Sequence, residues 1–309
     1  MTPFDRGGFA GLGVLWRNQS PVMRGVLMMC ISTVAFAVMH LSVRIASSEL
    51  HPFQIAFFRN LFGLAFLLPL LVGPGFAQMR TKRLGLHALR GAVNILAMLL
   101  FFSALSTTPL AKVTALGFTA PIFTSVLSVV ILREHFHLRR WVAIGLGFAG
   151  MLIILRPGFA IIETGALLVV ASALLWSVAL IIVKTLSRTE SSVAIVAWMG
   201  IFLSLLSIGP ALWVWRDPSL WAWGWLVFIG LSGTAAQVSL SQSLKETDPT
   251  AVMPFDFLKL VWASLLAFWY FGEIPDEMTL IGAAVIFGSG LYVAHRESVA
   301  AKADKSDGN

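Results

Sequence analysis

The stretch GVLMMCISTVAFAVMHLSVRI (Gly25–Ile45) decides the fold, because a similar stretch, GALLVVASALLWSVALIIVKT (Gly165–Thr185), returns about 140 residues later. The 19 residues between Arg24 and Arg44 carry no formal charge. A helix needs ~20 mostly apolar residues to cross the ~30 Å hydrocarbon core of a bilayer. The sequence therefore predicts a membrane-spanning helix that is present in two copies.

The composition of the whole chain agrees with a membrane protein. Of its 309 residues, 58% are hydrophobic and 12% are charged, and the mean hydropathy is +0.85. Because 22 basic and 15 acidic residues cannot cover the surface of a soluble globule, a soluble enzyme, a disordered chain and a secreted disulfide scaffold are excluded. The one cysteine, Cys30, excludes an internal disulfide and a cysteine-based metal site. We expect no cofactor, no metal ion and, since the net charge of +7 is not clustered, no nucleic-acid partner.

Ten apolar segments are predicted to be membrane helices, so the fold class is an all-α polytopic membrane protein. Helices are favoured over barrel strands because the apolar runs are continuous and do not alternate. Seven runs have no formal charge, and three more are interrupted or short. The seven lie between Arg24 and Arg44, Arg90 and Lys112, Lys112 and Arg133, Glu163 and Lys184, Glu190 and Arg216, Asp217 and Lys245, and Glu277 and Arg296; the others are Pro52–Val72, residues 141–155 and Pro249–Phe271.

The basic residues predict the orientation. If the N-terminus is cytoplasmic, 16 of the 22 Lys and Arg residues lie on the cytoplasmic side and 4 lie outside, and this bias is typical of an inner-membrane protein with both termini in the cytoplasm. Only Arg59 and Lys259 lie inside spans. Residues 1–20 are then a cytoplasmic N-terminal segment, and residues 297–309 are predicted to form a disordered cytoplasmic tail.

The repeat divides the chain into two halves of five helices, residues 21–157 and 158–296. Because five is odd, the second half must enter the membrane in the opposite direction, which is an architecture of secondary transporters with a solute site near the midplane. The matching positions share residue types: Gly25 with Gly165, Ser32 with Ser172, Phe36 with Trp176, Arg44 with Lys184, and Glu134 with Glu273.

Each half closes with a glutamate, in LREH (Glu134) and FGEI (Glu273), followed by a glycine-rich helix. This doubled pattern resembles the drug/metabolite transporter superfamily, specifically its EamA-type members. The strings AFFRN (Ala56–Asn60), APIF (Ala120–Phe123), LRPG (Leu155–Gly158), MPFDF (Met253–Phe257) and FGEIPD (Phe271–Asp276) are similar to one bacterial branch.

The resemblance implies a secondary transporter of a small organic solute in a bacterial inner membrane. The branch includes transporters of S-adenosylmethionine and riboflavin, and the alternative is an exporter of amino acids or other metabolites. Contact through the fifth and tenth helices would allow a homodimer. No ATP is implied, because the chain has no GxxxxGK[ST] loop.

Three ionisable residues inside spans are the first candidates for the solute site, because a charge at this depth faces a cavity or a partner. Arg59 could bind a carboxylate or phosphate, or it could turn to the interface or pair with Asp256. Asp256 and Lys259 share a helix face, so Asp256 could couple a proton or cation to transport, or the two could form a structural ion pair.

Other polar and aromatic residues in the spans have two interpretations each. His40, Asn94 and Gln237 could line a solute path or serve as interior hydrogen-bond partners. Pro121 and Pro254 could expose backbone carbonyls to a solute or only kink their helices. Trp176 and Trp198 could stack on a flat solute or pack in the core. Structural roles are expected for Glu134 and Glu273.

Two other function classes are disfavoured. A membrane-embedded enzyme would need clustered His, Asp or Glu residues within the spans, whereas His40 and Asp256 are far apart in the sequence. A scaffold without transport activity would not need Arg59, Asp256 and Lys259 in the bilayer. The sequence therefore predicts a transporter that is not an enzyme.

Overall fold

A computed structural model describes residues 19–71, 81–132, 138–156, 163–186, 189–190, 192–247, 252 and 255–306, and this part of the chain contains helices and no strand. The first half comprises α2 (Pro21–Ala46), α3 (Pro52–Leu71), α5 (Leu84–Thr107), α6 (Leu110–Gly117), α7 (Ala120–Leu132) and α8 (Leu138–Leu155). The second comprises α9 (Thr164–Leu186), α10 (Ser192–Trp213), α11 (Leu220–Glu246), α13 (Leu258–Phe271) and α14 (Glu277–Ser306).

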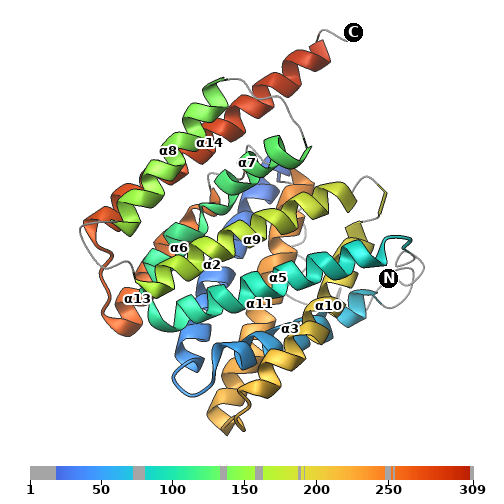
Figure 1. The fold of residues 1–309 in the computed structure, drawn as a ribbon, viewed down its shortest axis with the longest axis vertical. Coiled ribbons are helices and arrows are strands. Elements are labelled where there is room, and N and C mark those ends of the chain that lie inside the picture. The colour runs from blue at the N-terminus through green and yellow to red at the C-terminus, as the bar shows by residue number, and fades with distance from the viewer. Residues whose placement is uncertain are drawn as a thin grey trace.

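The two halves pack together through pairs of helices, and equivalent helices of the two halves make equivalent contacts. Helix α2 packs against α11 and α13, and its counterpart α9 packs against α5, α6 and α7. Counterparts also pack directly on each other, α3 on α10 and α8 on α14. These two pairs lie on opposite sides of the bundle in Figure 1. The core therefore lies along the boundary between the halves.

Matching serines make matching hydrogen bonds across this boundary. The Ser32 hydroxyl on α2 donates to the Ala236 carbonyl on α11 at 2.9 Å, and the Ser172 hydroxyl on α9 donates to the Ala97 carbonyl on α5 at 2.7 Å. Both serines are fully buried. Because equivalent residues of both halves have equivalent partners, the repeat is present in the packing as well as in the sequence.

The first and second halves run in opposite directions. Gly25, near the beginning of α2, lies against Thr247 at the end of α11, and Gly165, near the beginning of α9, lies against Thr108 at the end of α5. The ends of α2 and α5 line one cavity, so α9 begins at the face where α2 ends. We call the face with the beginning of α2 and the end of α11 the terminal face, and the other the opposite face.

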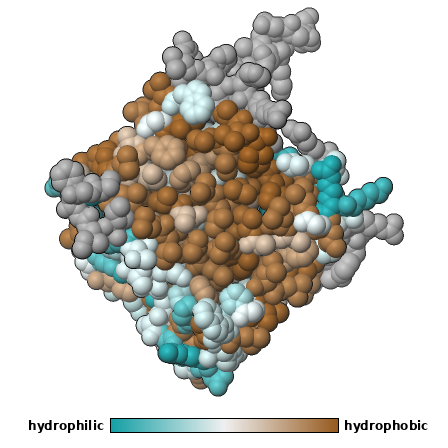
Figure 2. All heavy atoms as spheres, in the orientation of Figure 1, coloured by the Kyte–Doolittle hydropathy of each residue, from teal (hydrophilic) through white to brown (hydrophobic). Residues whose placement is uncertain are grey.

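Six described segments are long and apolar enough to cross a membrane, by length and composition: Pro21–Ala46, Leu84–Thr107, Leu110–Ile131, Thr164–Leu186, Ala194–Trp213 and Leu220–Glu246. Shorter apolar helices occupy the other predicted spans, at Pro52–Leu68, Ile144–Leu155, Leu258–Phe271 and Glu277–Tyr292. Large apolar side chains are exposed along these segments, and Figure 2 shows a wide apolar surface with hydrophilic residues toward its edges. This exterior fits a multi-pass membrane protein.

The structure adds one detail to the sequence-based prediction, in the fourth span, and differs from it at two places, Arg90 and the C-terminal tail. The fourth span is broken at Phe118 and Thr119, because Pro121 has no backbone N–H to continue the helix from α6 into α7. Arg90 lies inside α5 and is 8% exposed, although the charge pattern placed it in a loop. Helix α14 continues to Ser306 through most of the predicted disordered tail, whose Ala, Glu and Lys residues favour helix.

Candidate functional site

A charged pair lies at the boundary between the halves. The Lys259 ammonium is 2.9 Å from a carboxylate oxygen of Asp256, one turn earlier, and both side chains are mostly buried. The same ammonium lies 5.0 Å from the ring centre of Phe36 on α2 and 5.6 Å from that of Phe118, between α6 and α7. The ring faces stabilise the cation electrostatically, so the first half provides the aromatic walls for a charged pair of the second half.

Aromatic rings connect this pair to two other predicted site residues. The His40 ring lies 6.1 Å from Phe36 and 5.1 Å from Phe101, and Phe101 lies 5.5 Å from Trp176. His40 is 6% exposed, and its Nδ1 has no hydrogen-bond partner among the described residues. Helices α2, α5 and α9 thus present a continuous set of rings beside Lys259.

Arg59 lies on α3, which packs against α2, α5, α10 and α11. Its guanidinium donates to the Asn60 side chain at 3.0 Å and lies against Gly233 of α11. No described carboxylate lies within ion-pair distance of it, and Asp256 pairs with Lys259. Met39, which precedes His40 on α2, lies against the same glycine, so Arg59 is close to the segment of α2 that carries His40.

We call this group the central site. It contains two cations, one anion and several rings, which are the groups that recognise an anionic group and an aromatic ring. Its members are Phe36, His40, Arg59, Phe101, Phe118, Trp176, Asp256 and Lys259.

The remaining predicted site residues lie elsewhere or outside the described part. Asn94, one turn before Ala97, and Gln237, next to Ala236, adjoin the hydrogen bonds that join the halves. Pro121 is exposed at the helix break. The ring centre of Trp198 lies 6.2 Å from that of His87, with the ring planes tilted. Pro254 and Glu134 lie outside the described residues.

Glu273 is part of an ion pair that the sequence analysis did not identify. Arg44 donates to both carboxylate oxygens of Glu273, once at 2.7 Å, and its guanidinium lies 4.4 Å from the Phe271 ring centre. The Leu110 backbone N–H also points to Glu273, at 3.4 Å. The pair joins α2, α6 and α13 at the opposite face. The sequence contained one sign that Arg44 has a particular role, because the repeat aligns it with another basic residue, Lys184.

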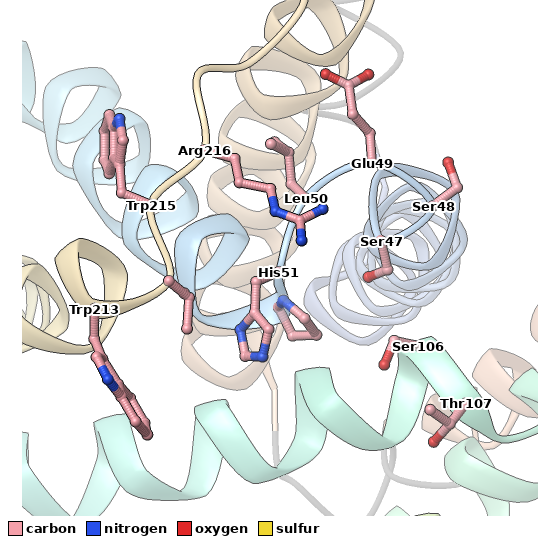
Figure 3. Close-up of a pocket in the computed structure, with 12 residues that line it drawn as sticks. Ser47, Ser48, Glu49, Leu50, His51, Ser106, Thr107, Trp213, Trp215 and Arg216 are labelled. Atoms are coloured by element: carbon pink, nitrogen blue, oxygen red, sulfur yellow. The ribbon is translucent and has the colours of Figure 1, made fainter.

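The opposite face also contains a cavity of about 600 Å³, formed by the α2–α3 turn and the ends of α5 and α10. Figure 3 shows the Arg216 side chain reaching into the hollow beside His51. The Glu49 carboxylate accepts bonds from the Ser219 backbone and hydroxyl, both at 2.7 Å. Partial burial, together with the nearby Arg216 charge, lowers the pKa of His51 below its usual value.

The sequence is similar to known transporters along nearly its whole length. The EamA-like transporter family matches it twice, over residues 23–156 and 163–294. An "S-adenosylmethionine uptake transporter" of Rickettsia bellii is 30% identical over 276 residues, 89% of this chain and 95% of that protein. A "Riboflavin transporter" of Rhizobium johnstonii is 30% identical over 276 residues, 88% of this chain and 91% of that protein. A solved crystal structure shares the fold, with a TM-score of 0.60, 18% identity and coverage of 88% of this chain and 98% of that one.

Proposed function

This chain belongs to the EamA-like transporter family, and from that premise we propose that it takes up a ring-bearing organic metabolite by alternating access between its two halves. The proposed solute site is the central site. The observation that carries the proposal is the ion pair Asp256–Lys259 of the second half seated against Phe36 and Phe118 of the first. A solute bound there would contact both halves at once, as alternating access requires.

The chemistry of the central site favours S-adenosylmethionine as the solute. Its carboxylate would bind Arg59, which has no carboxylate partner among the described residues, and its adenine ring would stack near Trp176. Its sulfonium group would be stabilised by the ring faces of Phe36 and Phe101. Rickettsial relatives named as uptake transporters of this metabolite support the choice.

Riboflavin is the second candidate, supported by relatives named for it. Its three-ring system fits a wall made of Phe101, Trp176 and His40, but it has no carboxylate to use Arg59. The two candidates therefore differ in their dependence on one side chain. Export of amino acids is a third outcome, which the same measurement would reveal.

The test is uptake into proteoliposomes that contain the purified chain, with labelled S-adenosylmethionine, riboflavin and a set of amino acids as solutes. Arg59→Gln should lower S-adenosylmethionine uptake at least tenfold and leave riboflavin uptake nearly unchanged. Arg83→Gln is the matched control, because Arg83 is exposed at the beginning of α5. Equal S-adenosylmethionine uptake by wild type and Arg59→Gln would contradict the proposed site.

We propose that all ten apolar segments cross a bacterial inner membrane with the terminal face in the cytoplasm. The distribution of basic residues supports this orientation. In a Cys30→Ser background, a cysteine at Ser48 should react with an impermeant maleimide added to intact cells, whereas one at Thr81 should react only after lysis. The reverse pattern would overturn the orientation.

We also propose that two copies associate through the outer surfaces of α8 and α14. Gly150 and Gly282 pack on each other within one chain, whereas Gly145 and Gly288 have no atom within 4 Å of an added Cβ and are exposed. The exposed glycines would permit close helix contact with a second copy. Light scattering in detergent should report a dimer for wild type and a monomer for Gly145→Leu/Gly288→Leu.

A further inference from the structure

A buried histidine lies at the terminal face, apart from the central site. His87 on α5 is 1% exposed, and neither ring nitrogen has a hydrogen-bond partner among the described residues. Its Nε2 is 3.9 Å from a carboxylate oxygen of Glu190, which lies between α9 and α10, and its ring centre lies 6.2 Å from that of Trp198 on α10, with the ring planes tilted. The first half thus contributes the imidazole, and the second half contributes the carboxylate.

The surroundings leave this carboxylate available to the histidine. The Glu190 side chain is 7% exposed, and its other oxygen accepts a 2.8 Å bond from the Thr81 hydroxyl. Arg90, one turn after His87, donates instead to the Ile195 carbonyl at 2.7 Å and contacts the Met199 sulfur at 3.2 Å.

Among the described charged groups, Glu190 is the one within 4 Å of His87, and Arg90 lies one turn after His87 on α5. Apolar side chains also pack close to this contact. They come from α5, α9 and α10, where Leu86 packs with Ile182, Leu186 and Ile195.

The repeat provides an internal comparison for this cluster. In register, His87 corresponds to Leu226, Glu190 to Leu50, Arg90 to Ile229 and Trp198 to Phe58, so the equivalent α11–α3 packing is entirely apolar at these positions. All four counterparts are buried. The fold therefore does not need polar groups at this place. Since burying an imidazole that has no hydrogen-bond partner among the described residues is costly, the presence of His87 beside Glu190 on only one side of the repeat indicates a function.

We propose that His87 and Glu190 form a proton-binding site that couples proton movement to transport, and this rests on the proposed transport function. A proton from the terminal-face solution would bind Nε2 of His87, and the resulting imidazolium would donate a charge-assisted hydrogen bond to Glu190. At 3.9 Å the two groups are just beyond hydrogen-bond distance, so a small movement of His87 and Glu190 toward each other would complete the contact. Protonation would hold the halves together at this face, and loss of the proton would release them.

The experiment uses proteoliposomes of the full chain with a pH-sensitive dye, and the solute is whichever of S-adenosylmethionine or riboflavin the wild type carries. Two readouts are taken. The first is net uptake with the accompanying proton movement at several pH values. The second is exchange of labelled for unlabelled solute at equal concentrations, which needs no net proton movement.

We expect His87→Gln and Glu190→Gln to lose proton movement and the pH dependence of net uptake, with net uptake reduced at least tenfold and exchange retained. His51→Gln, an exposed histidine at the opposite face, is the matched control and should behave as wild type. Because Glu190→Gln preserves shape, it serves as the second variant if His87→Gln does not fold.

Solute uptake by wild type without proton movement, or proton movement retained in both variants, would overturn the coupling site alone. A wild-type protein without uptake or exchange would overturn the transport function as well. The two failures are therefore distinguishable.

Discussion

Arg44 at the end of α2 and Glu273 after α13 form a two-pronged ion pair that joins the two halves at the opposite face. Their side chains are 16% and 24% exposed, so each charge is largely removed from water. The pair also holds the end of α13 beside the beginning of α6, through the Leu110 N–H.

We predict that Glu273→Gln lowers the thermal stability of the purified protein, because Arg44 would keep a partly buried charge without a partner. Removing one partner of a fully buried pair costs ~3–5 kcal/mol, and about 2 kcal/mol is expected here because some exposure remains. Thermal unfolding in detergent checks this. The double variant Arg44→Glu/Glu273→Arg should recover part of the loss, and a double variant no more stable than Arg44→Glu alone would contradict the pairing.

Gly91 and Gly230 occupy equivalent positions on α5 and α11. A Cβ added to Gly91 would lie 2.5 Å from Phe202 Cβ, and one added to Gly230 would lie 2.5 Å from Phe62 Cβ. Alanine at either position should therefore push two helices apart and destabilise the protein by about 1–3 kcal/mol. Gly209→Ala is the control, because nothing lies within 4 Å of its Cβ position. Equal thermal midpoints for the three variants would refute the close contact.

The pKa of His51 provides a pH-dependent prediction. Partial burial and the Arg216 charge lower this pKa in the folded protein, so the unfolded chain binds the proton more readily. The histidine's contribution to stability is therefore present above the usual pKa of about 6.5 and is lost as the pH falls below it. Arg216→Gln should raise the pKa of His51 toward its usual value. The pH dependence of His51 modification by diethyl pyrocarbonate, followed by mass spectrometry, measures the change, and an unchanged midpoint in Arg216→Gln would rule out the influence of Arg216.

The helices and the repeat could be predicted from sequence because both are written in local patterns. The apolar run after Gly25 has the length of a membrane span, and its return at Gly165 identifies the repeat. Because the two copies align, Gly25 and Gly165 make equivalent contacts, at the end of α11 and the end of α5 respectively. The break at Phe118 was foreseeable from Pro121 alone, since a proline interrupts the helix before it.

Pairings between distant side chains could not be read from the sequence. Arg44 and Arg90 looked like loop charges that fix topology, yet one pairs with Glu273 and the other is buried against α10. Spacing did reveal that Asp256 and Lys259 share a face, but it left open whether Asp256 pairs with Arg59. Which side chains meet depends on how the halves pack, and local patterns do not encode this.

A double-mutant cycle on Asp256 and Lys259 separates a structural pair from a transport site. If the 2.9 Å pair only stabilises the segment before α13, Asp256→Asn should destabilise the protein, and Asp256→Asn/Lys259→Met should restore stability together with uptake, because no charge is left unpaired. If Asp256 takes part in transport, the double variant should regain thermal stability while uptake stays at least tenfold below wild type.

We expect the second result, because Lys259 lies over the Phe36 and Phe118 rings at the boundary between the halves, where a solute would contact both. Thermal unfolding and proteoliposome uptake on the same preparations give both quantities, and recovery of full uptake in the double variant would remove Asp256 and Lys259 from the proposed site.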